Sequence, residues 1–169
     1  ASGNGVPGRN VTFAIATGGG GVSPTSATTD TAGRAAARWT LGPLAGGNSL
    51  IATSSGFSVT FQATGNSAAA TTLLSNSSTS QNGTAGLPAA APPSVRVTDA
   101  NGNAVAGVSI TFAVSGGGGS ILPVTPIATN ASGIATLTQW VLGTVAGANT
   151  VTASAAGLTP SQLTFTATG

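Results

Sequence analysis

Apolar and polar residues alternate along most of this chain, which is the pattern of β-strands with one buried face. The alternation is clearest over residues 108–114, where every second residue is a large apolar one. The dipeptide Asn101-Gly102 precedes this strand and favours a tight turn, because glycine readily adopts the positive φ angles that such turns need. The same turn-and-strand pattern opens the chain over residues 3–15.

Gly, Pro and Asn separate the alternating segments, and no segment shows a helical period. Short strands between such turns predict an all-β protein, an antiparallel sandwich or barrel. The strands are predicted over residues 10–17, 34–41, 48–54, 58–63, 71–75, 94–99, 108–115, 134–142, 149–155 and 162–167. One residue is inserted ahead of Trp140, and we expect a β-bulge at Thr138-Gln139, since a one-residue slip would otherwise turn Trp140 outward.

The sequence contains an internal repeat, because motifs of its first part occur again about 100 residues further on. The matched positions include Gly3 with Gly102, Phe13 with Phe112, Trp39 with Trp140, Asn48 with Asn149, and Phe61 with Phe165. We therefore predict two tandem antiparallel sandwiches, a partial repeat over residues 1–65 and a complete one over residues 66–169.

The first repeat has no counterpart of residues 66–99 and is expected to lack its N-terminal strand or strands. A sandwich without these strands exposes apolar surface and unpaired strand edges. We predict a strand-acceptor groove at Val11, Phe13 and Ile15.

Aromatic residues at matched strand positions are the predicted structural core. These residues are Phe13, Trp39, Phe61, Phe112, Trp140 and Phe165. The two tryptophans could instead stack on sugars, but their place within alternating strands favours the core.

Composition limits the chemistry that the chain can perform. The chain has four Arg and two Asp residues, and no His, Cys, Lys, Glu or Tyr. The usual general bases, activated nucleophiles and metal ligands are therefore absent, and we expect no enzyme activity, metal site or cofactor. A net charge of +2 without a basic cluster argues against nucleic acid binding, and no apolar run is long enough for membrane insertion.

Two further groups of residues have both a structural and a functional interpretation. Asp30 and Asp99, with Asn101 and Asn130, are interpreted as turn formers that bond to their own backbone rather than as calcium ligands. The glycine runs at residues 18–21 and 116–119 are interpreted as flexible loop tips, because neither is followed by Lys-Ser/Thr or a helix as in a phosphate-binding loop.

Combined motifs resemble those of the bacterial immunoglobulin-like repeats of intimin and invasin. They are G-N-x-V-x-G-V-x-I-x-F from Gly102, the glycine run, T-N-A-S-G-I-A from Thr129 and W-x-L-G-x-x-A-G-x-N from Trp140. The resemblance implies Ig-like β-sandwiches in tandem, forming a rigid extracellular stalk in an adhesin or fibre on the bacterial cell surface. Receptor contact in that family belongs to a terminal domain that these motifs do not include.

Two other functions fit the same residues. The chain could be a subunit of an extracellular filament or pilus, in which a neighbouring copy donates the strands that the first repeat lacks; otherwise Ala1 is the point at which a longer array was cut. It could also be a receptor- or glycan-binding module that acts through its loops. The expected partners are neighbouring Ig-like repeats or other copies of the chain, and no particular host receptor or glycan is indicated.

Overall fold

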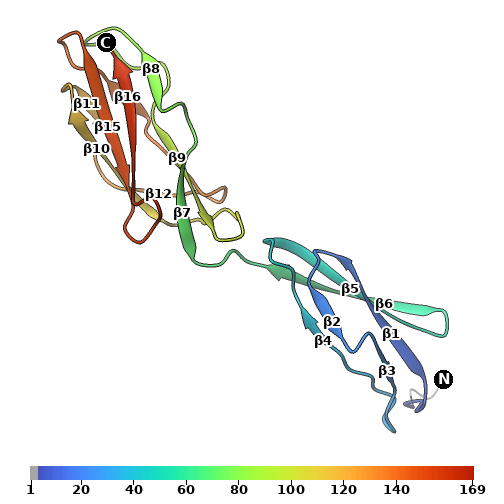
Figure 1. The fold of residues 1–169 in the computed structure, drawn as a ribbon. Coiled ribbons are helices and arrows are strands. Elements are labelled where there is room, and N and C mark those ends of the chain that lie inside the picture. Colours follow the sequence, from blue (N-terminus) through green and yellow to red (C-terminus); the bar gives the residue numbers. More distant parts are fainter. Residues whose placement is uncertain (1–3) are drawn as a thin grey trace. The chain divides into compact units, whose positions relative to one another are not determined.

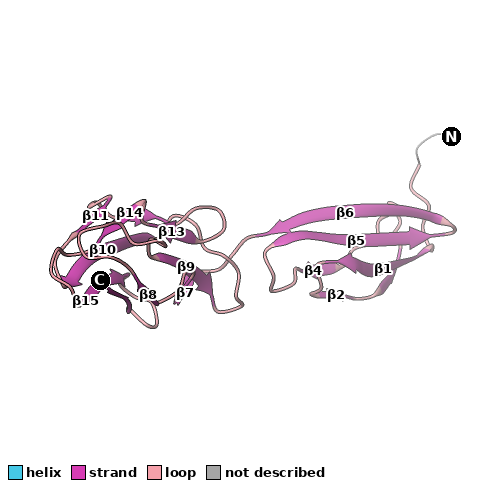
Figure 2. Ribbon diagram, turned by 90° about the horizontal axis from the view of Figure 1, so that it is seen from above, coloured by secondary structure: helices cyan, strands magenta, loops and turns pink. Residues whose placement is uncertain are grey.

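The computed structural model of this chain describes residues 4–169 and consists, over those residues, of strands and connecting loops (Figures 1 and 2). The chain divides into two compact units, Ala1–Asn66 (unit 1) and Ser67–Gly169 (unit 2). Each unit is described by itself. Gly3, which opens the first copy of the repeat, lies outside the described residues.

Unit 1 is built on one long antiparallel sheet in the order β3-β1-β5-β6. The short strands β2 and β4 pair separately with each other. The strands of unit 1 are β1 (Asn10–Thr17), β2 (Gly21–Ser23), β3 (Ser26–Thr28), β4 (Arg38–Thr40), β5 (Gly46–Ser54) and β6 (Phe57–Gly65). Figure 2 shows β5 and β6 side by side, in agreement with their pairing from Gly46↔Gly65 to Ser54↔Phe57.

Unit 2 is a sandwich with a closed core. One layer is the sheet β12-β10-β15-β16-β8, and the facing elements are the sheet β13-β9-β7 and the pair β11-β14. The strands are β7 (Ala70–Ser75), β8 (Ser80–Asn82), β9 (Ser94–Asp99), β10 (Ser109–Gly116), β11 (Ser120–Leu122), β12 (Ile127–Ala128), β13 (Ile134–Thr136), β14 (Gln139–Val141), β15 (Ala148–Ser154) and β16 (Gln162–Thr168).

The two units repeat each other strand by strand. Phe13 pairs with Ala52 in unit 1 as Phe112 pairs with Ala153 in unit 2. The pairing register shifts at the same place, after Ile15 in β1 and after its counterpart in β10. The sequence repeat is therefore also a repeat of strand register, so that equivalent positions can be compared residue by residue.

The segment around Trp140 differs from the predicted single bulged strand. Residues 134–142 form two strands in different sheets, since β13 pairs with β9 and β14 pairs with β11. At the change of partner, the backbone N–H and the Oγ1 of Thr138 both donate to the carbonyl oxygen of Leu122, at 2.8 and 3.0 Å. The inserted residue therefore carries the chain from one sheet to the other, and Trp140 still faces the core. In unit 1 only Arg38–Thr40 of the predicted strand over residues 34–41 is a strand.

A short strand that the pattern does not predict closes one edge of unit 2. β8 has the polar sequence Ser80-Gln81-Asn82 and runs parallel to the end of β16. The side chain of Gln81 donates to the backbone oxygen of Ala91 at 2.7 Å and accepts from its N–H at 3.1 Å. Because these residues neither alternate nor contain a large apolar side chain, strand periodicity could not reveal this strand.

Candidate functional site

The core of unit 2 is covered on both sides. Trp140 and Phe165 are 0% and 1% exposed, and Phe112 is also buried. Leu73 of β7 and Val97 of β9 lie in the same apolar cluster. The three aromatic positions predicted for this repeat therefore lie inside the closed sandwich.

The equivalent core of unit 1 is open. Phe13 is buried, Trp39 is half-buried and Phe61 is 48% exposed. The prediction of a core position is therefore wrong for Phe61. The reason is coverage: within the described residues of unit 1, no strand takes the place of β7, β8 or β9.

The apolar surface left uncovered in unit 1 forms a hollow of about 360 Å³, which we call the open face. It is lined by Phe13, Ala35, Ala36, Ala37, Trp39, Leu50, Phe61 and Gln62. Of the predicted groove residues, the hollow includes Phe13, whereas Val11 and Ile15 are half-buried and do not line it. The open face thus extends from β1 toward β4 and β6 rather than along β1 alone.

The indole nitrogens of Trp39 and Trp140 share one feature, although Trp140 is fully buried and Trp39 is half-buried. Both Nε1 atoms are buried without a hydrogen-bond partner in the described part of the chain. Trp140 lies in the apolar core of unit 2, and Trp39 lines a hollow in which Gln62 is the one polar side chain. Their position agrees with a packing role.

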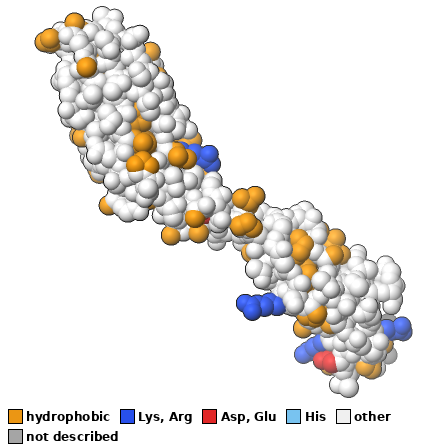
Figure 3. Space-filling view, in the orientation of Figure 1, with side chains coloured by type: hydrophobic (Ala, Val, Ile, Leu, Met, Phe, Trp, Pro, Cys, Tyr) orange, Lys and Arg blue, Asp and Glu red, His pale blue; other side chains and the backbone are white. Residues whose placement is uncertain are grey.

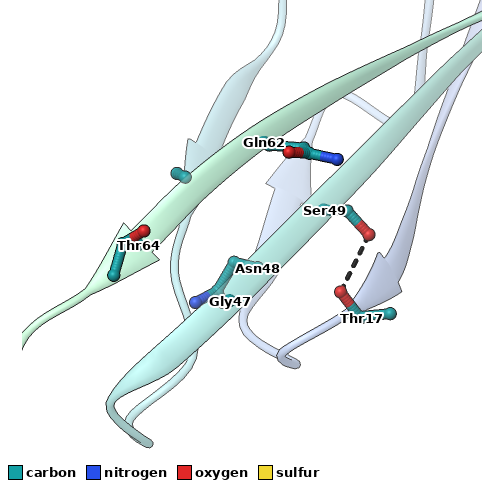
Figure 4. A pocket seen from close by; sticks show the side chains of 7 residues that line it. Thr17, Gly47, Asn48, Ser49, Gln62 and Thr64 are labelled. Carbon is teal, nitrogen blue, oxygen red and sulfur yellow. Dashed lines mark hydrogen bonds between the residues drawn. The ribbon is translucent and has the colours of Figure 1, made fainter.

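A second, polar hollow of about 580 Å³ lies at the end of the β5–β6 pair (Figure 4). Its lining residues are Thr17, Gly47, Asn48, Ser49, Gln62, Ala63 and Thr64. In Figure 4 the hydroxyls of Thr17 and Ser49 point toward each other, with their Oγ atoms 2.8 Å apart. The lining contains hydroxyl and amide groups but no ionisable side chain, so it offers hydrogen bonds without acid–base chemistry.

Asp99 organises the turn after β9. Its Oδ1 accepts from the backbone N–H groups of Asn101 and Asn103, both at 2.9 Å. Its Oδ2 accepts from the N–H of Ala68 at 2.8 Å and from the side-chain amide of Asn103 at 2.9 Å. These hydrogen bonds, with the Asn103 amide as the largest contribution, outweigh burial and lower the pKa of Asp99 to about 2.

Asp30 and Asn130 perform the same local task in the two units. Oδ1 of Asp30 accepts from the N–H groups of Ala32 and Arg34, and Oδ1 of Asn130 accepts from those of Ser132 and Ile134. These carboxylate and amide oxygens close turns on their own backbone, as the interpretation as turn formers requires. Within residues 4–169, His, Cys, Asp and Glu side chains form no group of three that could hold a metal ion.

Part of each glycine run is tightly packed, which the prediction of flexible loop tips did not foresee. A Cβ on Gly117 would lie 2.7 Å from Oδ1 of Asn149, and its φ of +77° also favours glycine. The same Oδ1 accepts from the N–H of Gly143 at 2.7 Å. Gly42 and Asn48 repeat this bond in unit 1 at 3.1 Å. In each unit a buried asparagine of β5 or β15 therefore packs against the glycine run and accepts a hydrogen bond from the loop at Gly42 or Gly143.

Few charged side chains show on the face in Figure 3, and an acidic one lies beside a basic one at the lower right. The described residues contain no helix with the length and apolarity needed to cross a membrane.

Comparison with known proteins relates unit 2 to a family. The family model described as bacterial Ig-like domain (group 1) matches residues 88–168. Unit 2 contains a bacterial Ig-like domain. Unit 1 repeats its motifs and strand register, which confirms the resemblance to bacterial Ig-like repeats and the all-β Ig-like fold.

Two solved structures with TM-scores above 0.5 agree with this fold. The Escherichia coli adhesin FdeC is 17% identical, with a TM-score of 0.62, over 97% of this chain and 54% of that one. InvD of Yersinia pseudotuberculosis is 23% identical, with a TM-score of 0.58, over 98% of this chain and 48% of that one. The D0-D1 domain of intimin is 17% identical, with a TM-score of 0.38, over 99% of this chain and 82% of that one. The chain spans about half the length of the FdeC and InvD structures, and no curated protein matches its sequence.

Proposed function

We propose that the chain is a structural segment of a bacterial cell-surface adhesin, in which its Ig-like units act as a rigid extracellular stalk. The observation that carries the proposal is that one bacterial Ig-like unit occurs twice in tandem with the same strand register. FdeC, which shares the fold, is itself described as an adhesin. Domains used as spacers need a stable fold and no chemistry of their own.

The side chains of unit 2 suit such a role. Its packed interior is apolar, and its one carboxylate, Asp99, is fully engaged in hydrogen bonds. With few charges in the chain, stability should depend little on salt or on pH near neutrality. The absence of His, Cys, Lys, Glu and Tyr from the sequence supports the further proposal that the segment is not catalytic.

Location and stalk function can be tested separately. Antibodies raised against residues 67–169 should label intact cells of the source bacterium, and labelling that needs permeabilised cells would contradict a surface location.

For the stalk, the chain is displayed on a bacterial host between a surface anchor and a nanobody, and capture of cells on immobilised antigen is measured. Inserting a second copy of residues 67–169 should increase capture at antigen recessed within a polymer layer. The control replaces the inserted copy with a Gly/Ser linker of the same length, which behaves as a flexible coil. Equal capture by the linker would overturn the stalk proposal.

A further inference from the structure

The first strands of unit 2 run in the same direction as its last strand. β8 pairs with the end of β16 in parallel, from Ser80↔Thr166 to Asn82↔Thr168. Ahead of β8, β7 makes a parallel bridge to the segment just before β16. The other strand pairs of unit 2 are antiparallel. Figure 1 shows β8 and the end of β16 near the C-terminus, and the start of β7 at the opposite end of the unit.

Hydrogen bonds between β8 and β16 follow the alternation of a parallel pair. The N–H of Thr166 donates to Thr79 O at 2.9 Å, and the N–H of Gly83 donates to Thr168 O at 2.8 Å. The odd-numbered residues along β8, Gln81 among them, therefore direct their backbone groups toward β16. Oγ1 of Thr166 adds a second bond to Thr79 O at 3.2 Å.

Both strands are also anchored to the rest of unit 2. The side chain of Gln81 bonds to the backbone of Ala91 twice, and the N–H of Gly86 donates to Gly143 O at 2.9 Å. At the end of β16, the N–H and the carbonyl of Gly169 each bond to Gly147, at 3.0 and 2.8 Å. Sliding β8 along β16 therefore breaks bonds between the two strands and bonds to their surroundings.

Tension along the chain loads this contact in one direction. A pull on Ser67 passes through β7 and draws β8 toward its beginning, whereas a pull on Gly169 draws β16 toward its end. Because the strands are parallel and their hydrogen bonds run across them, these opposite pulls slide one strand past the other. The bonds then share the load and must break together. In an antiparallel hairpin, a pull on the two free ends breaks the bonds one after another.

We propose that the β8–β16 contact is a mechanical clamp that holds unit 2 folded when the chain is under tension. The proposal rests on the stalk function, because tension reaches both ends of unit 2 when the segment lies between an anchor and an attached target. β7 resists the same pull ahead of the clamp. The N–H of Thr159 donates to Thr71 O at 2.9 Å, and the side chain of Leu73 is 0% exposed.

Single-molecule force measurements on the full chain test the direction of loading. The chain has no cysteine, so two introduced thiols define the points at which DNA handles pull. Thr79→Cys with a cysteine added after Gly169 shears β8 against β16, and Thr79→Cys with Thr164→Cys peels the same strands apart from one end. At the same loading rate, the first rupture should need a higher force in the sheared arrangement. An equal or lower force there would overturn the proposal.

Variants of β8 test the bonds themselves. Gln81→Pro removes an N–H that faces β16 together with the side chain, and Gln81→Ala removes the side chain alone. With handles at Ser67→Cys and after Gly169, Gln81→Pro should shorten the lifetime of folded unit 2 at constant force about fivefold relative to Gln81→Ala, as for the loss of one hydrogen bond. Asn82→Pro is the matched control, because the N–H of Asn82 faces away from β16 and an edge strand tolerates proline there. It should leave the lifetime unchanged.

Equal lifetimes of the two Gln81 variants, or the same shortening by Asn82→Pro, would overturn the proposal. Urea unfolding without applied force provides the remaining control. If Gln81→Pro accelerates unfolding in urea as much as it does under tension, β8 contributes only ordinary stability and the clamp is refuted. None of these outcomes affects the stalk test, which measures capture by cells rather than resistance to force.

Discussion

The same substitution should destabilise the protein less at Phe61 than at Phe165. The two residues occupy the same position of the repeat, but Phe61 is far more exposed. A phenylalanine side chain presents about 200 Å² of surface, worth about 5 kcal/mol at 25 cal/mol per Å² when fully buried. Phe165 is 1% exposed, so its burial contributes nearly all of this energy. Phe61 is 48% exposed, so its burial contributes about half. Replacement by Ala also leaves a cavity at Phe165, but at Phe61 it only deepens a surface that is already open.

We therefore expect Phe165→Ala to destabilise unit 2 by about 3–5 kcal/mol and Phe61→Ala to destabilise unit 1 by roughly 1–2 kcal/mol. The two units can be measured in one chain through their tryptophans. In a Trp39→Phe background Trp140 reports on unit 2, and in a Trp140→Phe background Trp39 reports on unit 1. Urea unfolding followed by fluorescence then gives each free energy of unfolding against its own parent variant.

The comparison has a clear contrary result. Equal losses at the two positions, or a larger loss at Phe61, would mean that the inner surface of unit 1 is as well covered as that of unit 2. The reasoning from exposure would then fail.

Three further predictions use the same unfolding assay or a light-scattering measurement. The pKa of Asp99 is lowered from 3.8 to about 2, so its ionised form stabilises the folded state above pH 3.8, and this contribution is lost as pH falls through 2. The urea midpoint of unit 2 should fall in this window, and Asp99→Asn should lower the midpoint at neutral pH and remove most of the fall. Asn149→Ala should lower the free energy of unfolding of unit 2 by about 1–3 kcal/mol, because the buried N–H of Gly143 loses its acceptor. An unchanged free energy of unfolding would show that water replaces the amide. Phe57→Ser, at a side chain 82% exposed, should change stability by less than about 0.5 kcal/mol and reduce scattering at high concentration, and a larger loss of stability would contradict its exposure.

The sequence predicted the elements whose residues alternate, and it missed those whose place depends on distant partners. β1 and β9 have the predicted bounds because alternation and turn residues define them locally. The polar strand β8 forms only because the end of β16 offers it an edge. Periodicity also could not show that residues 134–142 divide between two sheets, since the change depends on the carbonyl of Leu122.

The candidate site shows the same limit for burial. Alternation correctly places Phe61 on the inner side of its strand, opposite Leu50, but the side chain is covered only where another strand lies above it. The tight packing of the glycine runs was missed for a related reason. The contact that fixes Gly117 comes from Asn149, more than 30 residues away in the chain, and nothing in the run itself points to it.

Because the two units repeat the same strands, the burial of each position in unit 1 can be compared with that of its counterpart in unit 2. Leu50 and Val151 occupy the same register position, and so do Phe61 and Phe165. The side chains at these positions are similar, so the difference in exposure arises from what lies above them rather than from the strands that carry them.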